Sequence, residues 1–207
     1  MLLKHPFFVL LVLACLVLIM PGCVSVTPVI PDGVAEDIWK TRSEKLYQQD
    51  YWTAHLAIVG KTTSQKFKTR AIWEQKGNNY TIKLLDFIGR TIAVIESTPH
   101  GVQAKTSKGQ QYRSETAEQL IQQLFDIKIP VSGMRYWLLG IPKPDSDVSK
   151  LQLNPRGLAD EVRQEGWLMS YSDYLNQQPF QMPGHILLGY EDVDLSVRTS
   201  QWSFASE

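Results

Sequence analysis

The stretch Gln65–Glu96, QKFKTRAIWEQKGNNYTIKLLDFIGRTIAVIE, decides the fold of this chain. Apolar and polar residues alternate along Gln65–Gln75, Tyr80–Asp86 and Arg90–Glu96, which is typical of half-buried strands. Between the first two lies Lys76–Asn79, whose glycine and asparagines tolerate positive φ and favour a turn. Because turns this short join antiparallel strands, whereas parallel strands need long crossovers, the stretch predicts an antiparallel meander.

The same alternation continues on both sides of this stretch. A strand is predicted upstream, and a hairpin with a turn at Ser107–Gly109 is predicted directly downstream. Four more strands are predicted in the last quarter of the chain. Together they make about ten strands, the further ones being Trp52–Gly60, Val102–Thr106, Gln110–Arg113, Leu158–Gln164, Trp167–Tyr174, His185–Tyr190 and Val193–Trp202.

Helical patterns occur in two places, one before the first strand and one between the sixth and seventh strands. Val34–Asp50 is amphipathic. The run from Ser114, SETAEQLIQQLFDI, carries an apolar stripe spaced by three and four residues, and Ile129-Pro130 ends it. Ser132–Gly140 is predicted to be a second short helix of this insert, followed by a loop over residues 142–154. We therefore predict one mainly β domain of the α+β class, residues 34–207, with two or three helices.

The amino-terminal residues have the pattern of a bacterial lipoprotein leader. Phe7–Met20 is an apolar run of 14 residues, shorter than the roughly 20 that span a bilayer, and Met20-Pro21-Gly22-Cys23 follows it and resembles a lipobox. This predicts a signal peptide over residues 1–22, lipidation of Cys23, and an extended tether over residues 23–33. Cys15 is the competing lipidation site, and an uncleaved apolar anchor is the other alternative.

Composition and the absence of motifs exclude several classes of function. The 21 basic and 21 acidic side chains balance, which gives no electrostatic case for binding nucleic acid. Both cysteines, Cys15 and Cys23, lie in or at the end of the leader, so the fold has no disulfide and no catalytic thiol. The four histidines show no metal-ligand spacing, and neither a Gly-x-Ser-x-Gly elbow nor a phosphate-binding loop is present. We therefore expect no catalytic residues, no metal and no cofactor.

Short segments in a fixed order carry a family resemblance over nearly the whole chain after the leader. They are Trp73-Glu74-Gln75, Leu84–Gly89, Tyr112, Ala117–Leu124, Ile129-Pro130-Val131, Trp137–Pro142, Gln164–Trp167, Tyr171, Met182-Pro183 and Trp202. With these segments the chain resembles the LolB family, the outer-membrane receptors of the bacterial lipoprotein-localisation pathway. Two positions depart from the family pattern: Thr53-Ala54-His55 replaces a glycine–arginine pair, and Ile88 replaces a leucine. Val24 after the cysteine fits the family sorting rule for the outer membrane.

The resemblance implies a half-open antiparallel β-barrel of about 10–11 strands, like LolA and LolB, closed on one side by helices. An apolar cavity would take the acyl chains of a lipoprotein from the periplasmic carrier LolA and release them to outer-membrane lipid. The protein is then a lipid-anchored monomer on the periplasmic face, with an acylated lipoprotein as cargo. Trp73, Trp137 and Trp167 are candidates for lining the cavity, and ordinary core packing is the alternative for each. The alternative functions are a lipocalin-like binder of small lipids and a non-catalytic envelope tether.

The sharpest candidate site is the predicted hairpin tip between Asp86 and Arg90. Phe87 and Ile88 are apolar residues at a position that normally faces water. The family's protruding loop places its apolar residue at the position of Ile88, where it engages the membrane. We therefore expect Ile88, together with Phe87, to form a membrane-engaging loop, with Phe87 folding back onto the sheet as the alternative.

Overall fold

The structure, a computed structural model, describes residues 33–205, all of them in the second of two compact units, Asp32–Glu207. The predicted signal peptide, Cys23 and Cys15 lie outside the described residues, as does the tether except for Gly33. In chain order the elements are α2 (Val34–Tyr47), β1 (Tyr51–Lys61), β2 (Lys66–Lys76), β3 (Asn79–Leu85), β4 (Thr91–Thr98), β5 (Gly101–Thr106), β6 (Gln111–Ser114), α3 (Ala117–Phe125), α4 (Val131–Trp137), β7 (Val148–Leu153), β8 (Ala159–Gln164), β9 (Trp167–Ser172), β10 (Leu175–Gln177), β11 (Phe180–Met182), β12 (His185–Tyr190) and β13 (Val193–Phe204).

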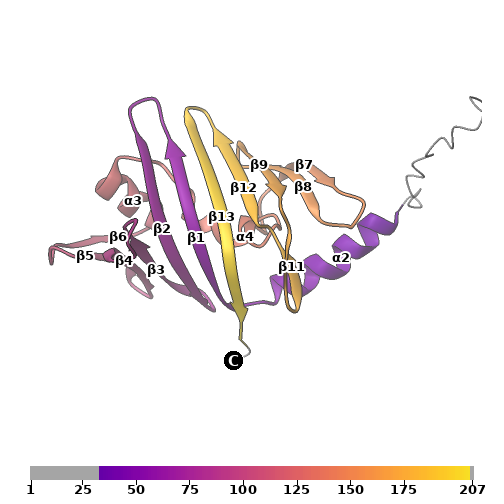
Figure 1. Cartoon of the computed structure of the whole chain (residues 1–207), viewed down its shortest axis with the longest axis horizontal. Coiled ribbons are helices and arrows are strands. Elements are labelled where there is room, and N and C mark those ends of the chain that lie inside the picture. Colours follow the sequence, from indigo (N-terminus) through magenta and orange to yellow (C-terminus); the bar gives the residue numbers. More distant parts are fainter. Residues whose placement is uncertain (1–32, 206–207) are drawn as a thin grey trace, which may run out of the picture. The chain divides into compact units, whose positions relative to one another are not determined.

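Eleven strands form one antiparallel sheet in the order β6-β5-β4-β3-β2-β1-β13-β12-β9-β8-β7. The longest strands, β1, β2 and β13, lie side by side in its middle, and Figure 1 shows the sheet curving away on both sides of them. The end strands β6 and β7 do not pair with each other, so the sheet remains open. This confirms the predicted fold class, a half-open antiparallel barrel.

The alternation that predicted the strands sorts their side chains onto two faces. In β1 and β13 alternate residues are buried, and the register places Ala54 opposite both Trp73 and Trp202. Because neighbours in register point to the same face, these residues share the inner face of the sheet. The hydrophobic core lies between that face and the helices.

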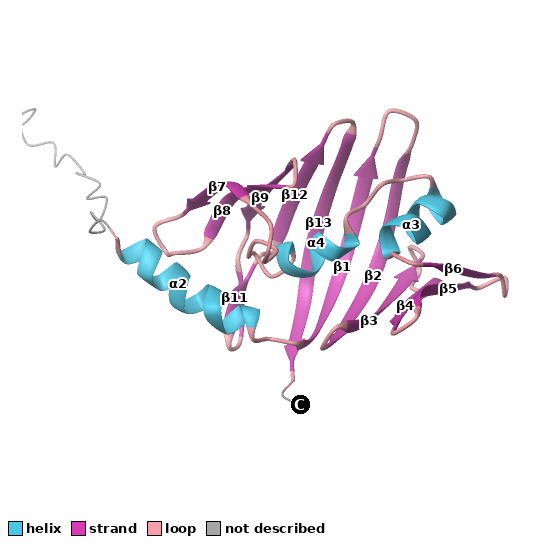
Figure 2. Ribbon diagram, turned by 180° about the vertical axis from the view of Figure 1, so that it is seen from behind, coloured by secondary structure: helices cyan, strands magenta, loops and turns pink. Residues whose placement is uncertain are grey.

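Helices α3 and α4 lie against the inner face of the sheet, as Figure 2 shows from their side. Thr116 caps α3, its Oγ1 accepting a hydrogen bond from the backbone N–H of Gln119, and the helix ends at Asp126 with φ of 55°. The predicted stripe consists of Leu120, Ile121, Leu124 and Phe125. Its first two residues are buried, Leu124 is half-buried and Phe125 is exposed. α4 is shorter than predicted, and Leu138–Gly140 continue it as a turn.

Three strands were not predicted. β7 lies inside the segment predicted to be a loop, residues 142–154, and that prediction was wrong. Five of its six residues are exposed, so no buried alternate row marks it in the sequence. β10 and β11 have three residues each and form a separate small hairpin, too short to show a period.

Helix α2 is attached to the rest of the unit by few residues. Only Arg42, Ser43 and Leu46 are buried. The Arg42 guanidinium donates through Nη2 to the carbonyl oxygens of Leu139 at 3.1 Å and Gln181 at 2.8 Å. Burial lowers the pKa of Arg42 from its ordinary value. Backbone carbonyls thus hold this cation in place of a carboxylate.

Candidate functional site

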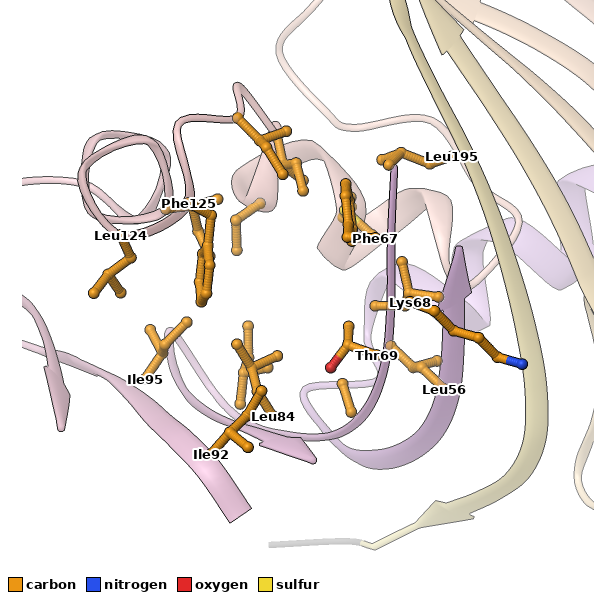
Figure 3. Close-up of a pocket in the computed structure, with 18 of the residues that line it drawn as sticks. Leu56, Phe67, Lys68, Thr69, Leu84, Ile92, Ile95, Leu124, Phe125 and Leu195 are labelled. Atoms are coloured by element: carbon orange, nitrogen blue, oxygen red, sulfur yellow. The ribbon is translucent and has the colours of Figure 1, made fainter. Parts of the chain in front are cut away.

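A cavity of about 780 Å³ lies between the inner face of the sheet and the helices (Figure 3). This volume falls within the range of roughly 300–1,000 Å³ that is usual for ligand sites. Its floor consists of inward-facing residues of five strands, nearly all of them aliphatic or aromatic: Leu56, Ile58, Phe67, Thr69, Ala71, Trp73, Ile82, Leu84, Ile92, Ile95 and Leu195.

The roof of the cavity comes from α3, α4 and the segment between them, which together form a lid. The lid presents mostly apolar side chains to the cavity, and Leu124 and Phe125 face the strand residues in Figure 3. Its apolar lining residues are Ile121, Leu124, Phe125, Ile127, Ile129, Val131 and Met134.

Polar lining residues are concentrated at the rim. Among residues 33–205, Lys68 and Asp126 are the only charged residues that line the cavity, and both are exposed. The Lys68 ammonium points away from the other labelled side chains in Figure 3. The interior is therefore apolar, with charge only where the cavity meets solvent.

Phe67 lies in the cavity wall because the residue opposite it is a glycine. Gly60 and Phe67 are partners in the β1–β2 register. A Cβ atom placed on Gly60 would lie 2.0 Å from Cζ of the Phe67 ring, so that ring covers a position that only glycine leaves open.

Of the three candidate tryptophans, Trp73 lies in the wall of this cavity. It belongs to an inner-face aromatic cluster, 5.8 Å from Trp52 and 5.7 Å from Tyr80 between ring centroids. Its Nε1–H donates to Oε1 of Gln75 at 3.1 Å, and Gln75 in turn donates to the carbonyl oxygens of Gly77 and Asn79. These bonds satisfy the buried polar atom and fix the ring.

Trp137 and Trp167 lie outside the lining of this cavity. They pack against each other with ring centroids 6.2 Å apart, and Trp167 stacks on Tyr190. Trp137 is completely buried and donates to Oε1 of Gln164 at 2.9 Å. The structure thus separates the three tryptophans into one cavity residue and one pair, from the end of α4 and the start of β9, that packs outside the cavity lining.

The loop Asp86–Arg90 holds two apolar side chains in solvent. Phe87 is 84% exposed and Ile88 is 60% exposed, so Phe87 does not fold back onto the sheet. Asp86 organises the loop, since its Oδ1 accepts from the backbone N–H groups of Ile88 and Arg90, and its Oδ2 accepts from Arg90 Nε at 2.7 Å. Gly89 has a φ of 89°, which a side chain would disfavour.

The electrostatics of the loop follow from these contacts. Desolvation raises the pKa of Asp86, but the hydrogen bonds and charge of Arg90 and the N–H of Ile88 outweigh it, so the pKa lies below its ordinary value. The Asp86–Arg90 pair therefore carries little net charge, and the tip it holds is apolar.

Within residues 33–205, no three histidine, cysteine or acidic side chains gather as they would to hold a metal ion. None of the helices in the same range is long and apolar enough to cross a membrane.

Sequence reasoning did not identify most of the cavity. Leu84 and Ile129 are apolar members of a predicted strand and helix end, and the sequence assigns neither to a ligand site. The helical stripe that contains Leu124 fits a core helix and the underside of a lid equally well. The available signal was the inward-facing row of each strand, which is the same for a residue that lines a cavity and for one that packs in a core.

Comparison with known proteins agrees with this geometry. Residues 50–202 match the family model described as "Outer membrane lipoprotein LolB". The outer-membrane lipoprotein LolB of Tolumonas auensis is 30% identical over 81% of this chain and 84% of its own length. That of Alkalilimnicola ehrlichii is 26% identical over 95% of this chain and 97% of its own length.

Solved structures support the fold alone. A LolA superfamily protein from Nitrosomonas europaea superposes with a TM-score of 0.50 over 84% of this chain and 94% of that one, at 11% sequence identity. A DUF1329 family protein from Desulfovibrio piger gives a TM-score of 0.51 at 6% identity, over 82% of this chain and 91% of that one.

Proposed function

The chain belongs to the LolB family of outer-membrane lipoproteins, which act in lipoprotein localisation, and from this membership we propose that it accepts acylated lipoproteins from the periplasmic carrier LolA and delivers them to outer-membrane lipid. The lidded apolar cavity is the observation that carries the proposal. A receptor of this kind needs a binding site for acyl chains and a means of reaching a bilayer, and the described residues offer a candidate for each.

The cavity suits acyl chains because its interior is lined mostly by apolar side chains. Moving a methylene group from water into such a site is worth about 0.8 kcal/mol, so a chain of ordinary length gains a large free energy from burial. The polar parts of the cargo, its cysteine and peptide, would remain at the rim near Lys68 and Asp126, where lining residues are exposed.

The direction of transfer follows from relative affinities. Cargo moves from carrier to receptor without an energy source if the receptor binds the same chains more tightly, and a difference of about 1.4 kcal/mol gives a tenfold bias. Release then requires a bilayer that binds the chains more strongly still.

The loop Asp86–Arg90 is the proposed contact with that bilayer. Phe87 and Ile88 are exposed on a loop that Asp86 fixes, and within residues 33–205 neither belongs to the hydrophobic core or to the partly buried residues packed against it. Insertion of Phe87 and Ile88 among lipids would bury their exposed surface and bring the rim of the cavity close to the membrane. The protein works as a monomer, with lipidated Cys23 as its anchor.

The test is a transfer assay with cross-linking. A photoreactive residue replaces Leu124, under the lid, or Gln122, which is exposed on the same helix and absent from the cavity lining. LolA loaded with an acylated lipoprotein is added to the full chain in nanodiscs. Cross-links to cargo at position 124 and not at 122 support the proposal. Equal labelling at both positions, or none at 124, contradicts it.

The same assay, with a fluorescent fatty acid as a second probe, separates the alternative functions. A small-lipid cup would bind a fluorescent fatty acid in the cavity but take no lipoprotein from the carrier. An envelope tether would bind neither.

A further inference from the structure

Strand β2 is longer than its neighbour β3. The two pair from Lys76 opposite Asn79 to Arg70 opposite Leu85. Beyond Arg70, β2 continues through Lys66–Thr69, and these four residues pair with β1 alone. We call Lys66–Thr69 the free edge of β2.

The hydrogen bonds at the two ends of the β1–β2 ladder show which backbone groups this edge presents. Thr62 N donates to Gln65 O at 2.8 Å, and Gly77 N donates to Asp50 O at 3.0 Å. Between the Thr62–Gln65 and Asp50–Gly77 pairs the register of β1 and β2 is unbroken. In an antiparallel ladder every second residue pair is hydrogen-bonded, so every second residue of β2, counted from Gln65 to Gly77, directs its N–H and C=O at β1. Phe67 and Thr69 belong to this set of residues.

Lys66 and Lys68 belong to the other set, so their N–H and C=O groups point away from β1, towards the free edge. Arg70, in the same set, is where pairing with Leu85 begins. Among residues 33–205 no backbone partner lies against the N–H and C=O groups of Lys66 and Lys68. The free edge thus presents four unpaired backbone groups, the N–H and the C=O of Lys66 and of Lys68.

This edge is continuous with the cavity. Lys68 and Thr69 both line it, and the Lys68 ammonium points away from the other labelled side chains in Figure 3. β3 ends at Leu85, beside the start of the free edge, and the loop Asp86–Arg90 leaves the sheet there. The Thr69 hydroxyl donates to Leu85 O at 3.0 Å and fixes this junction.

We propose that the free edge of β2 binds, as an added strand, the peptide that follows the acylated cysteine of the cargo. This rests on the proposed function, because acyl chains inside the cavity oblige the attached peptide to leave at the rim. An extended peptide there finds unpaired N–H and C=O groups at hydrogen-bonding distance from its own main chain.

Main-chain pairing suits a receptor that takes cargo of many sequences. The hydrogen bonds of an added strand do not depend on the side chains of the peptide. The charges of Lys66 and Lys68 disfavour pairing of this edge with the same edge of a second copy, which would bring four cations together.

Amide hydrogen exchange on the full chain in nanodiscs tests the proposal. One probe is a tripalmitoylated cysteinyl hexapeptide without proline. The others are the same lipopeptide N-methylated at alternate residues, in both frames, and a fluorescent fatty acid. With the lipopeptide we expect exchange at Lys66 and Lys68 to slow at least ~10-fold, since these amides gain partners. Phe67 and Thr69, already paired with β1, should change little.

The controls distinguish the edge from the cavity. One frame of N-methylation should abolish the protection, and the fatty acid should produce none. If the lipopeptide displaces the fatty acid but protects neither lysine amide, the edge proposal fails while the proposed function stands. If neither probe enters the cavity, the proposed function itself fails. Protection that rises with protein concentration without any probe would assign the edge to a second copy and overturn the proposal.

A variant pair tests the same contact from the protein side. Lys66→Pro removes one N–H that β1 does not use, and proline is tolerated at the first residue of a strand and where a strand N–H faces outward. Lys66→Gln removes the charge and keeps the N–H. Lys66 does not line the cavity. We expect Lys66→Pro to weaken lipopeptide binding about tenfold and to leave fatty-acid binding unchanged, and we expect Lys66→Gln to leave both unchanged. If Lys66→Pro fails to fold, the N-methylated lipopeptides decide the outcome.

Discussion

Gln65, directly before β2, is joined to Phe125, the last residue of α3, by a hydrogen bond from Gln65 Nε2 to the Phe125 carbonyl oxygen at 3.0 Å. Both residues line the cavity, so the bond spans from its floor to its lid. The bond is exposed, and a neutral hydrogen bond contributes only about 0.5–1.5 kcal/mol, so it can hold the lid closed and still break readily.

Replacing Gln65 by glutamate should loosen the lid, because a carboxylate cannot donate to the Phe125 carbonyl and is repelled by it. We expect faster uptake and faster release of a fluorescent fatty acid, each by about three- to tenfold if the whole bond is lost. Stopped-flow fluorescence measures both rates. Gln123→Glu, on the exposed part of the lid lining, adds the same charge without touching this bond. Equal rates in the Gln65 variant and the wild type would contradict the assignment.

Ile88→Glu should leave uptake of cargo from the carrier intact and impair delivery to liposomes. Ile88 is 60% exposed, so the change removes no core contact, yet it places a charge where the loop is proposed to enter lipid. Transfer of a labelled lipoprotein to liposomes measures delivery. Gln110→Glu, in the turn before β6, is the matched control and should deliver normally. Unchanged delivery by Ile88→Glu would remove the loop from the mechanism.

The loop should also loosen in acid. Because the pKa of Asp86 in the folded protein lies below its ordinary value of 3.8, its contacts favour the folded loop at neutral pH. That contribution is lost as the pH falls through the folded-state pKa. Carboxyl titration by NMR should show a higher pKa for Asp86 in Arg90→Gln than in the wild type, since the main hydrogen-bond donor is gone. The same pKa in both proteins would show that Arg90 does not hold the carboxylate.

Trp137→Phe should lower stability and leave the cavity intact. It leaves Gln164 Oε1 without the indole N–H, although that oxygen keeps a bond from Lys143 N. We expect a loss of about 1–3 kcal/mol in the free energy of unfolding from the bond and the smaller ring. Denaturant unfolding measures this.

Quenching of tryptophan fluorescence by a brominated fatty acid locates the rings relative to the cavity. Because Trp73 lines the cavity and Trp137 does not, the quenched fraction should fall in Trp73→Phe and persist in Trp137→Phe. The reverse pattern would place the acyl site beside Trp137 and outside this cavity.

Removal of residues 1–23, which include the predicted leader and the lipidated cysteine, should show that cargo binding does not depend on the membrane anchor. Without its lipid the protein should still take cargo from the carrier, because the cavity lies wholly within residues 56–195. Delivery to the correct membrane should be lost, and fractionation of cells carrying labelled cargo measures this. If the unlipidated protein binds no acylated cargo, the proposed function is contradicted.

The meander was predictable because its strands are half-buried. β2 and β3 alternate buried and less buried residues, and short turns join them. β7 gave no such signal, since a strand at the end of a sheet with almost all residues exposed has no buried row. β10 and β11 are too short to have a period.

The site was less predictable than the fold, for a physical reason. Trp73 and Trp137 are both almost fully buried and both donate to a glutamine, and only the position of the lid places one beside empty space. Phe87 illustrates the opposite case. Its exposure depends on hydrogen bonds from the loop backbone to Asp86, which the order of residues suggests but does not specify.

The short helices of the lid link its folding to occupancy of the cavity. α3 has nine residues and α4 has seven, whereas an isolated helix in water is marginal below about 12–15 residues. Their helical state therefore depends on apolar contact with the cavity side, the surface that acyl chains would share. Folding of the lid and occupancy of the cavity are then linked equilibria, and cargo adds to the stability of the roof that encloses it. The linkage is reciprocal, so a mutation that weakens the lid helices lowers cargo affinity without touching the cargo.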